Sequence, residues 1–213
     1  MSGAREEILA RARDALRETA TDVPVAREYR VAGGHAPGSE SALDLLVDRL
    51  VDYRAVVHHA DSDQVAAAVA TILAGAGSVV VPHDLDRQWL ADLPAGTTIV
   101  HDSRVNPRTA NELDRVDAVV TAARIAIAET GTIVLDGEPD QGRRAISLVP
   151  DVHVCVVRRD QVVHSVPEAV RALGTHAERP QTWISGPSAT SDIELTRVEG
   201  VHGPRTLHVV LVR

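Results

Sequence analysis

The sequence contains no lysine and no phenylalanine, and it has a single cysteine. Without lysine, the chain has neither a Schiff-base residue nor the lysine of a Walker-type phosphate site. One cysteine excludes an intramolecular disulfide, and it excludes an iron–sulfur cluster held by this chain's thiolates, which needs several cysteines. Redox centres, if the protein works with any, therefore belong to partner proteins.

Membrane-spanning and secretory segments are also missing. No apolar run approaches the roughly 20 residues that cross a bilayer, and residues 1–12 lack the continuous apolar segment of a secretory signal. We therefore expect a cytoplasmic protein without a membrane span. The net charge of −8 argues against nucleic-acid binding, because neutralisation of phosphates dominates that affinity. The remaining class is a globular protein, and 213 residues suffice for one α/β domain.

The first 40 residues differ in pattern from the rest. Apolar residues recur at helical spacing within 5–16, whereas 21–39 contains two prolines and three glycines and has no sustained period. We predict an N-terminal helix and an extended arm over 1–40, followed by one α/β domain over 41–213.

Within 41–213, short β-branched runs alternate with helical patterns, which predicts right-handed crossovers and a mainly parallel, Rossmann-like sheet with helices on both faces. The last strand is expected to close the sheet. The predicted strands are 53–58, 78–81, 97–100, 117–121, 152–158, 181–185 and 207–212, and the predicted helices are 41–51, a segment capped at Asp61, 84–93, 107–113, which begins at a proline, and 166–173.

Histidines follow three of the predicted strands, where ligands of parallel sheets bind. One interpretation is that they line a polar crevice or exposed turns. The other is a metal site made of three imidazoles and a carboxylate, but the spacing lacks a tight pair such as His-x-x-x-His. We therefore predict no metal. The residues concerned are His58, His59, His83, His101 and Asp102.

A polar motif interrupts the apolar run 125–136. It consists of Glu129, Thr130, Gly131 and Thr132, and a carboxylate between apolar segments is costly to bury unless it is paired. Glu129 is thus either a catalytic residue or the acceptor of the amides of the Gly131 turn. Thr130, Gly131 and Thr132 are predicted to bind the ligand. Downstream, Arg143 and Arg144, on a helix-like stretch, offer guanidinium groups for a carboxylate or phosphate, although a solvated, exposed arginine pair is the alternative.

The densest group of polar and turn-forming residues lies between 184 and 205. Glycine and proline favour turns whose amides and hydroxyls converge on an anion, and we place the hydroxyls near a helix N-terminus, although an ordinary helix cap is the alternative. Two carboxylates follow, at least one of which we expect to pair with arginine, and then a histidine that either tunes the site by its protonation or only braces the turn. The predicted ligand-binding residues here are Ser185, Gly186, Ser188, Thr190, Asp192, Glu194 and His202.

With both motifs in place, the chain resembles the lactate-utilisation protein C family, the small single-domain members of the LUD group. The resemblance covers 43–212 and excludes the first 40 residues. It implies a fold like that of the sugar-phosphate isomerase and CoA-transferase superfamily. It also implies a role in bacterial oxidation of L-lactate to pyruvate beside two iron–sulfur partner proteins. The motifs that carry it are 128–133, 142–144 ahead of Pro150, 184–194 and 200–204.

Three functions remain open from the sequence. The first is a subunit of an L-lactate utilisation system that binds a small carboxylate or phosphate without carrying electrons. The second is a stand-alone isomerase or acyl/CoA-transfer enzyme, because the CoA transferases of this superfamily use a glutamate in a Glu-x-Gly turn that is similar to Glu129-Thr130-Gly131. The third is an assembly factor. In the first two cases we expect 129–132 and 185–190 to lie in contact at one site, and the residues identify no cofactor.

Overall fold

The structure, a computed structural model, describes residues 3–17, 25–190, 198–199 and 202–213. Its contacts divide the chain into two units, 1–30 and 31–213. In the first unit, helix α1 (Ala4–Ala15) buries none of its residues. Across the described part of the chain, no helix combines the length and the apolar character that a membrane span requires.

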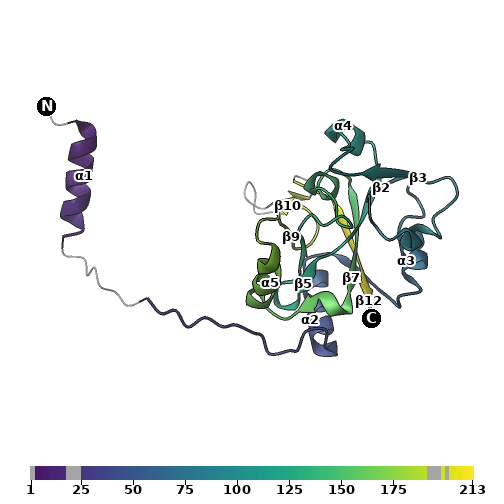
Figure 1. Cartoon of the computed structure of the whole chain (residues 1–213), viewed down its shortest axis with the longest axis horizontal. Helices are drawn as coiled ribbons and strands as arrows, with labels where there is room; N and C mark the ends of the chain where they lie inside the picture. The colour runs from purple at the N-terminus through teal and green to yellow at the C-terminus, as the bar shows by residue number, and fades with distance from the viewer. Residues whose placement is uncertain (1–2, 18–24, 191–197, 200–201) are drawn as a thin grey trace. The chain divides into compact units, whose positions relative to one another are not determined.

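Six strands of the second unit form one sheet in the order β1-β12-β7-β4-β2-β3 (Figure 1). All neighbouring pairs run parallel, which confirms the predicted mainly parallel sheet. The last strand completes the sheet as expected, from an interior position between β1 and β7, which suits a strand that buries both faces. The strands are β1 (Val56–Ala60), β2 (Ser78–Pro82), β3 (Thr98–Asp102), β4 (Ala118–Ala122), β7 (Val152–Arg158) and β12 (Thr206–Val212).

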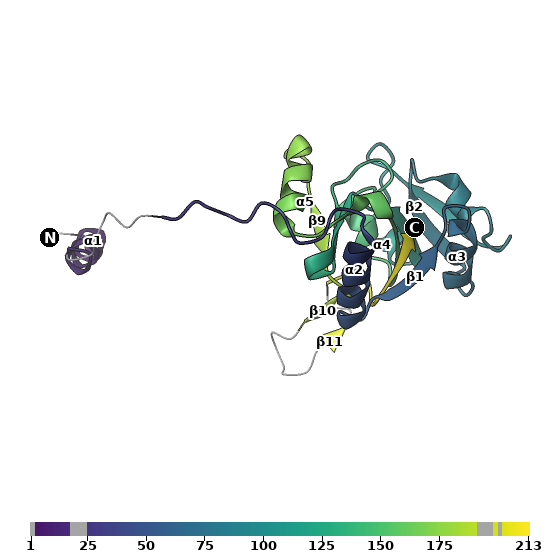
Figure 2. The same cartoon turned by 90° about the horizontal axis from the view of Figure 1, so that it is seen from below.

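Helices cover both faces of this sheet. Helix α2 (Glu40–Asp52) packs on the face that carries Cys155 and Val157, and helix α3 (Val65–Ile72) packs on the face that carries Val154 and Val156. Because successive residues of a strand point to opposite faces, the valine-rich strand β7 serves both cores. Figure 2 shows the two helices on opposite sides of the strands.

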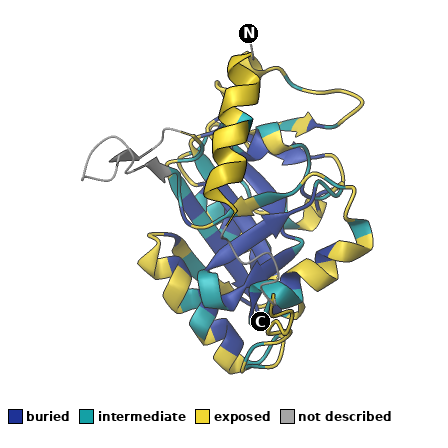
Figure 3. Cartoon of the chain, turned by 90° about the vertical axis from the view of Figure 1, so that its left-hand side faces the viewer, coloured by how far each residue is buried: buried dark blue, intermediate teal, exposed yellow. Residues whose placement is uncertain are grey.

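A second, smaller sheet adds a layer on the α2 side. It has the order β8-β5-β6-β9, and helix α5 (Val166–Leu173) packs against it through buried Ala169 and Leu173. Its inner face joins the core beneath α2, and Figure 3 shows the buried strands of both sheets. The sequence predicted strand 181–185 but not this separate sheet. Its strands are β5 (Ile125–Ile127), β6 (Thr132–Leu135), β8 (Val162–Val163) and β9 (Thr182–Ile184).

Two predicted helices differ in extent. Helix α4 (Ala110–Leu113) does not begin at Pro107, because Thr109 and Glu112 form a reciprocal capping box that sets a later start. The segment 84–93 forms only the 3-10 helix η1 (Arg87–Leu90), since the Asp86 carboxylate caps the amide of Gln88 within a tight turn. The other short elements are η2 (Ala128–Thr130), η3 (Arg144–Ser147), η4 (Arg159–Gln161), η5 (Gly174–His176), β10 (Ala189–Thr190) and β11 (Val198–Glu199).

The segment 31–39, which the sequence assigns to the arm, belongs to the second unit. The carbonyl of Val31 accepts a hydrogen bond from Arg171 Nη2 at 3.0 Å, and the amide of Gly38 donates to the carbonyl of Val162 at 2.9 Å. Ser39 then caps α2 by accepting from the amide of Ala42. This segment therefore runs beside α5 and β8 before the helix begins.

Candidate functional site

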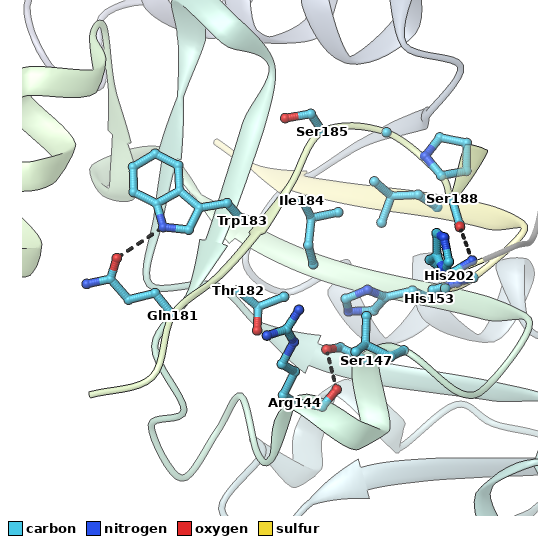
Figure 4. A pocket seen from close by; sticks show the side chains of 16 residues that line it. Arg144, Ser147, His153, Gln181, Thr182, Trp183, Ile184, Ser185, Ser188 and His202 are labelled. Atoms are coloured by element: carbon cyan, nitrogen blue, oxygen red, sulfur yellow. Dashed lines mark hydrogen bonds between the residues drawn. The ribbon is translucent and has the colours of Figure 1, made fainter. Parts of the chain in front are cut away.

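A cavity of about 350 Å³ lies where β9 and the loop that follows it approach the amino ends of β7 and β12 (Figure 4). It combines a guanidinium, three serine hydroxyls and two imidazoles with apolar side chains such as Leu148, Ile184 and Leu207, a composition suited to a small polar ligand. The lining residues come from η3, the start of β7, β9 with its loop, and the turn before β12: Arg144, Ser147, Leu148, His153, 181–188, 202–204 and Leu207.

A second depression lies at the carboxyl ends of β1 and β12, the edge where parallel sheets commonly bind ligands. It measures about 590 Å³ and contains the carboxyl groups of Asp63, Asp84, Asp86 and Asp140. Among the described residues that line it, a single guanidinium lies beside them, that of Arg158, which is paired with Asp160. Burial, followed by the nearby Glu138 carboxylate, raises the pKa of Asp140. Because these carboxyl groups disfavour an anion, the cavity at the amino ends is the better candidate for an anionic ligand.

The two predicted motifs meet beside this cavity. Strand β9 pairs with β6, with Ile184 opposite Ile133. This pairing brings the Ser185 hydroxyl to 2.8 Å from Thr132 Oγ1, which in turn lies 2.8 Å from Thr130 Oγ1. The expected contact between 129–132 and 185–190 is therefore confirmed. Among the described residues, however, 185–188 line the cavity and 129–132 do not. Residues 129–132 therefore support the cavity wall through the contact of Thr132 with Ser185.

Glu129 and Gly131 occupy supporting positions. The amide of Glu129 donates to the carbonyl of His164 at 2.9 Å, and the residue is half-buried outside the set that lines the cavity. Gly131 has a φ of 58° and packs on helix α2, where a Cβ would lie 2.8 Å from Arg49 Cβ. Its amide donates to the carbonyl of Ala128 at 3.4 Å, so this amide already has a partner within the turn.

Ser188 holds the turn 202–204, which forms another wall of the cavity. Its hydroxyl oxygen accepts from the amide of His202 at 2.9 Å, and its amide donates to the carbonyl of Pro204 at 2.8 Å. The serine's own O–H thus points to no acceptor among the described residues and is available to a ligand. The expected helix N-terminus is absent here in the described residues, since Ser188 leads directly into strand β10.

Three predicted site residues have no described side chain. The backbone of Thr190 pairs with Val198 in a short antiparallel ladder. Asp192 and Glu194, with their expected arginine partner, lie outside the described residues.

The two neighbouring arginines have different environments. Arg143 Nε donates to Asp102 Oδ2 at 2.9 Å, and its Nη2 donates to the other carboxylate oxygen and to the carbonyl of Arg108. The Asp102 carboxylate raises the pKa of this guanidinium. Arg143 therefore fastens the loop after β3 and lies outside the cavity, whereas Arg144 lines it. The adjacent arginine is thus the better ligand-binding candidate.

His153 is a cavity residue that sequence reasoning missed. It lies in β7, is completely buried, and forms a 2.8 Å hydrogen bond between Nε2 and Thr121 Oγ1. Its Nδ1 is buried without a hydrogen-bond partner among the described residues. Burial lowers its pKa to about 4, so the imidazole is neutral at physiological pH. The only signal in the sequence is one polar residue within an apolar strand.

Acidification is expected to weaken the fold through His153. The unfolded histidine binds a proton near pH 6.5, whereas the folded one does so only near 4, so stability is lost as the pH falls through this window. Between pH 7.5 and 5 the loss is about 2 kcal/mol from this residue. Urea unfolding at both pH values, in wild type and in His153→Gln, measures it as the difference between the two proteins. Equal pH dependence in both would contradict the assignment.

The strand-end histidines do not gather into one site. His58 Nε2 lies 3.1 Å from His208 Nδ1, and burial followed by repulsion from a neighbouring imidazole lowers the pKa of each. His83 lies 3.8 Å from Asp84. Within the described ranges, no three histidine, cysteine or acidic side chains are arranged to hold a metal ion, so the metal alternative gains no support.

Comparison with known proteins places the fold and both motifs in one group. The LUD domain model matches residues 43–212. A lactate utilization protein C of Deinococcus radiodurans is 50% identical over 167 residues, which are 78% of this chain and 76% of that protein. A lactate utilization protein C of Geobacillus thermodenitrificans is 29% identical over 157 residues, and the match covers 65% of this chain and 63% of that protein.

A solved structure is similar as well. The crystal structure of a DUF162 family protein from Deinococcus radiodurans matches with a TM-score of 0.69 and 42% sequence identity. The match covers 81% of this chain and 97% of the other. This likeness supports the α/β architecture described above.

Proposed function

Because the chain belongs to the LUD domain family, we propose that it is a subunit of a bacterial L-lactate utilisation system and binds a small anionic ligand in the cavity beside β9. Two of its relatives are named for lactate utilization. The observation that carries the proposal is Arg144, which lines the cavity and has no ion-pair partner among the described residues. An arginine fork that is open to a cavity favours a carboxylate or phosphate.

Hydroxyl groups complete the expected binding surface. The Ser188 hydroxyl has its proton available, and the Ser185 hydroxyl is held by Thr132. Both lie in the wall that also contains Ser147 and His202. A carboxylate held by the guanidinium accepts further hydrogen bonds from such hydroxyls, which fix its orientation.

Electron transfer is assigned to partner proteins. Oxidation of lactate to pyruvate removes two electrons and two protons, and this chain has one cysteine. Burial raises the pKa of the Cys155 thiol to about 12, so it is not a thiolate at neutral pH. We infer that iron–sulfur partner proteins carry the electrons while this chain holds the ligand.

The acyl-transfer alternative has less support. A nucleophilic glutamate must reach the substrate, whereas Glu129 lies outside the described residues that line the cavity. We therefore do not favour an enzyme that uses this carboxylate.

Replacing Arg144 by glutamine is expected to weaken binding of L-lactate, pyruvate or phosphate by about tenfold or more, because a hydrogen bond to a charged group contributes roughly 1.5–3 kcal/mol. Titration calorimetry on the purified protein measures the affinity. Arg87→Gln is the matched control, since Arg87 is exposed in η1 and lies outside the cavity.

Growth tests the biological part of the proposal. A deletion strain is expected to lose growth on L-lactate, and the wild-type gene should restore it where the Arg144→Gln gene does not. Unchanged affinity in Arg144→Gln would show that the ligand binds elsewhere. Normal growth of the deletion strain on L-lactate would remove the assignment to lactate utilisation.

A further inference from the structure

The floor of the cavity contains a polar group that the fold does not use. His153 is completely buried in β7 and lines the cavity (Figure 4). Its Nε2 is bonded to Thr121, but its Nδ1 has no partner among the described residues. Burying a polar atom without a hydrogen bond costs free energy. Its presence beside a cavity therefore points to a ligand that supplies the missing partner; because the side chain has no exposed surface, such a ligand reaches Nδ1 only when the adjoining cavity wall shifts.

A chain of hydrogen bonds indicates which ring nitrogen carries the proton. The carbonyl of Ala122 can only accept, so the Cys155 thiol donates to it, at 3.8 Å. The thiol sulfur then accepts from Thr121 Oγ1 at 3.7 Å. With the hydroxyl proton of Thr121 assigned to this sulfur, the threonine oxygen accepts from His153 Nε2–H, at 2.8 Å; in the other tautomer the hydroxyl donates to Nε2, and the NMR experiment below distinguishes the two. Nδ1 is therefore left with a lone pair and acts as an acceptor.

The chemistry of the cavity follows from this tautomer. An acceptor at the floor matches a ligand O–H, whereas the oxygen of a ketone or of a carboxylate would face the lone pair and be repelled. Arg144, which lines the same cavity, matches a carboxylate. A small carboxylate that also bears a hydroxyl group satisfies both groups at once.

We propose that His153 is the specificity-determining residue of this cavity: its Nδ1 accepts a hydrogen bond from the ligand's hydroxyl group, and the cavity therefore takes small hydroxy carboxylates in preference to the matching oxo or unsubstituted acids. This inference rests on the proposed anion-binding function of the same cavity.

Nitrogen NMR of the histidine-labelled protein tests the tautomer without any ligand. We expect His153 to show a protonated Nε2 and an unprotonated Nδ1 at neutral pH. Thr121→Ser keeps the hydroxyl and should keep this tautomer, whereas Thr121→Val removes the acceptor and should change it. A protonated Nδ1 in the wild type would overturn the inference.

Binding of three acids of the same carbon skeleton tests the specificity. Wild type is expected to bind L-lactate about tenfold more tightly than propanoate, the contribution of one hydrogen bond to a buried acceptor, and also more tightly than pyruvate. In His153→Gln the glutamine amide can keep the bond to Thr121 but has no atom at the Nδ1 position. The preference should then fall to within about twofold, while Thr121→Ser retains it.

The outcomes separate this inference from the proposed function. Equal wild-type affinities for lactate and propanoate, or a preference for pyruvate, would overturn the role of His153 and leave anion binding intact. Binding of phosphate but of none of the three acids would overturn only the role of His153, and failure of wild type to bind any of these anions would overturn both. A preference that survives in a folded His153→Gln protein, as judged by its thermal melt, would also overturn the role of His153.

Discussion

Replacing Asp102 by alanine is expected to lower the free energy of unfolding by about 3 kcal/mol, the lower end of the range for breaking a buried ion pair. The Asp102 side chain is completely buried, and that of Arg143 is 25% exposed. The carboxylate also accepts from the amide of Arg108 at 2.8 Å. Its loss leaves a partly buried guanidinium and a backbone amide without their acceptor, which is the costly situation.

Urea unfolding followed by circular dichroism measures this change. Asp48→Ala is the matched control, because Asp48 forms an ion pair with Arg49 in which both side chains are exposed, and such pairs contribute about 0–1 kcal/mol. A loss below about 1 kcal/mol for Asp102→Ala, equal to that of the control, would show that the loop after β3 does not need this pair.

Replacing Gly186 by alanine is expected to cost about 3 kcal/mol, from the strain of a left-handed backbone and from overpacking. Gly186 has a φ of 78°, and a Cβ there would lie 2.4 Å from the carbonyl oxygen of Tyr53 and 2.9 Å from its Cβ. Neither atom can move without displacing the end of α2. Because Gly186 lies in the cavity wall, ligand affinity should fall together with stability.

Gly96→Ala is the control for this substitution, since a Cβ at Gly96 meets no atom within 4 Å. Its effect should stay within about 0.5 kcal/mol. Thermal melts of both variants and calorimetry with L-lactate give the two readouts. If Gly186→Ala melts with the wild type and binds as tightly, the turn does not pack on α2 as the structure describes.

The main sheet could be predicted because its strands are apolar enough to be recognised one by one. The valine run of β7 coincides with the predicted strand 152–158, and both of its faces are buried. Although β9 was predicted as a strand, the small sheet that it joins could not be predicted, because the other strands β5 and β6 contain only three and four residues. Runs so short fit a turn or a helix as well as a strand, and only the tertiary pairing of β6 with β9 decides.

The candidate site was predicted in part for a related reason. The glycine, proline and serine residues at 185–188 and 202–204 predict turns from the sequence alone, and both turns line the cavity. Whether an arginine faces a cavity or a buried aspartate depends on contacts far along the chain, so Arg143 and Arg144 could not be told apart. His153 was missed because a single imidazole in a strand is usually core, and only its unpartnered Nδ1 distinguishes it.

The interior position of β12 has a consequence for synthesis of the protein. Among the described strands, β1 pairs with β12 alone, and the facing residues His58 and His208 are 150 positions apart. A ribosome adding about 5–20 residues per second needs roughly 8 to 30 seconds to make that interval. During these seconds β1 has no strand with which to pair. The nascent chain thus carries an unpaired strand for seconds, and unpaired strand edges are prone to aggregation.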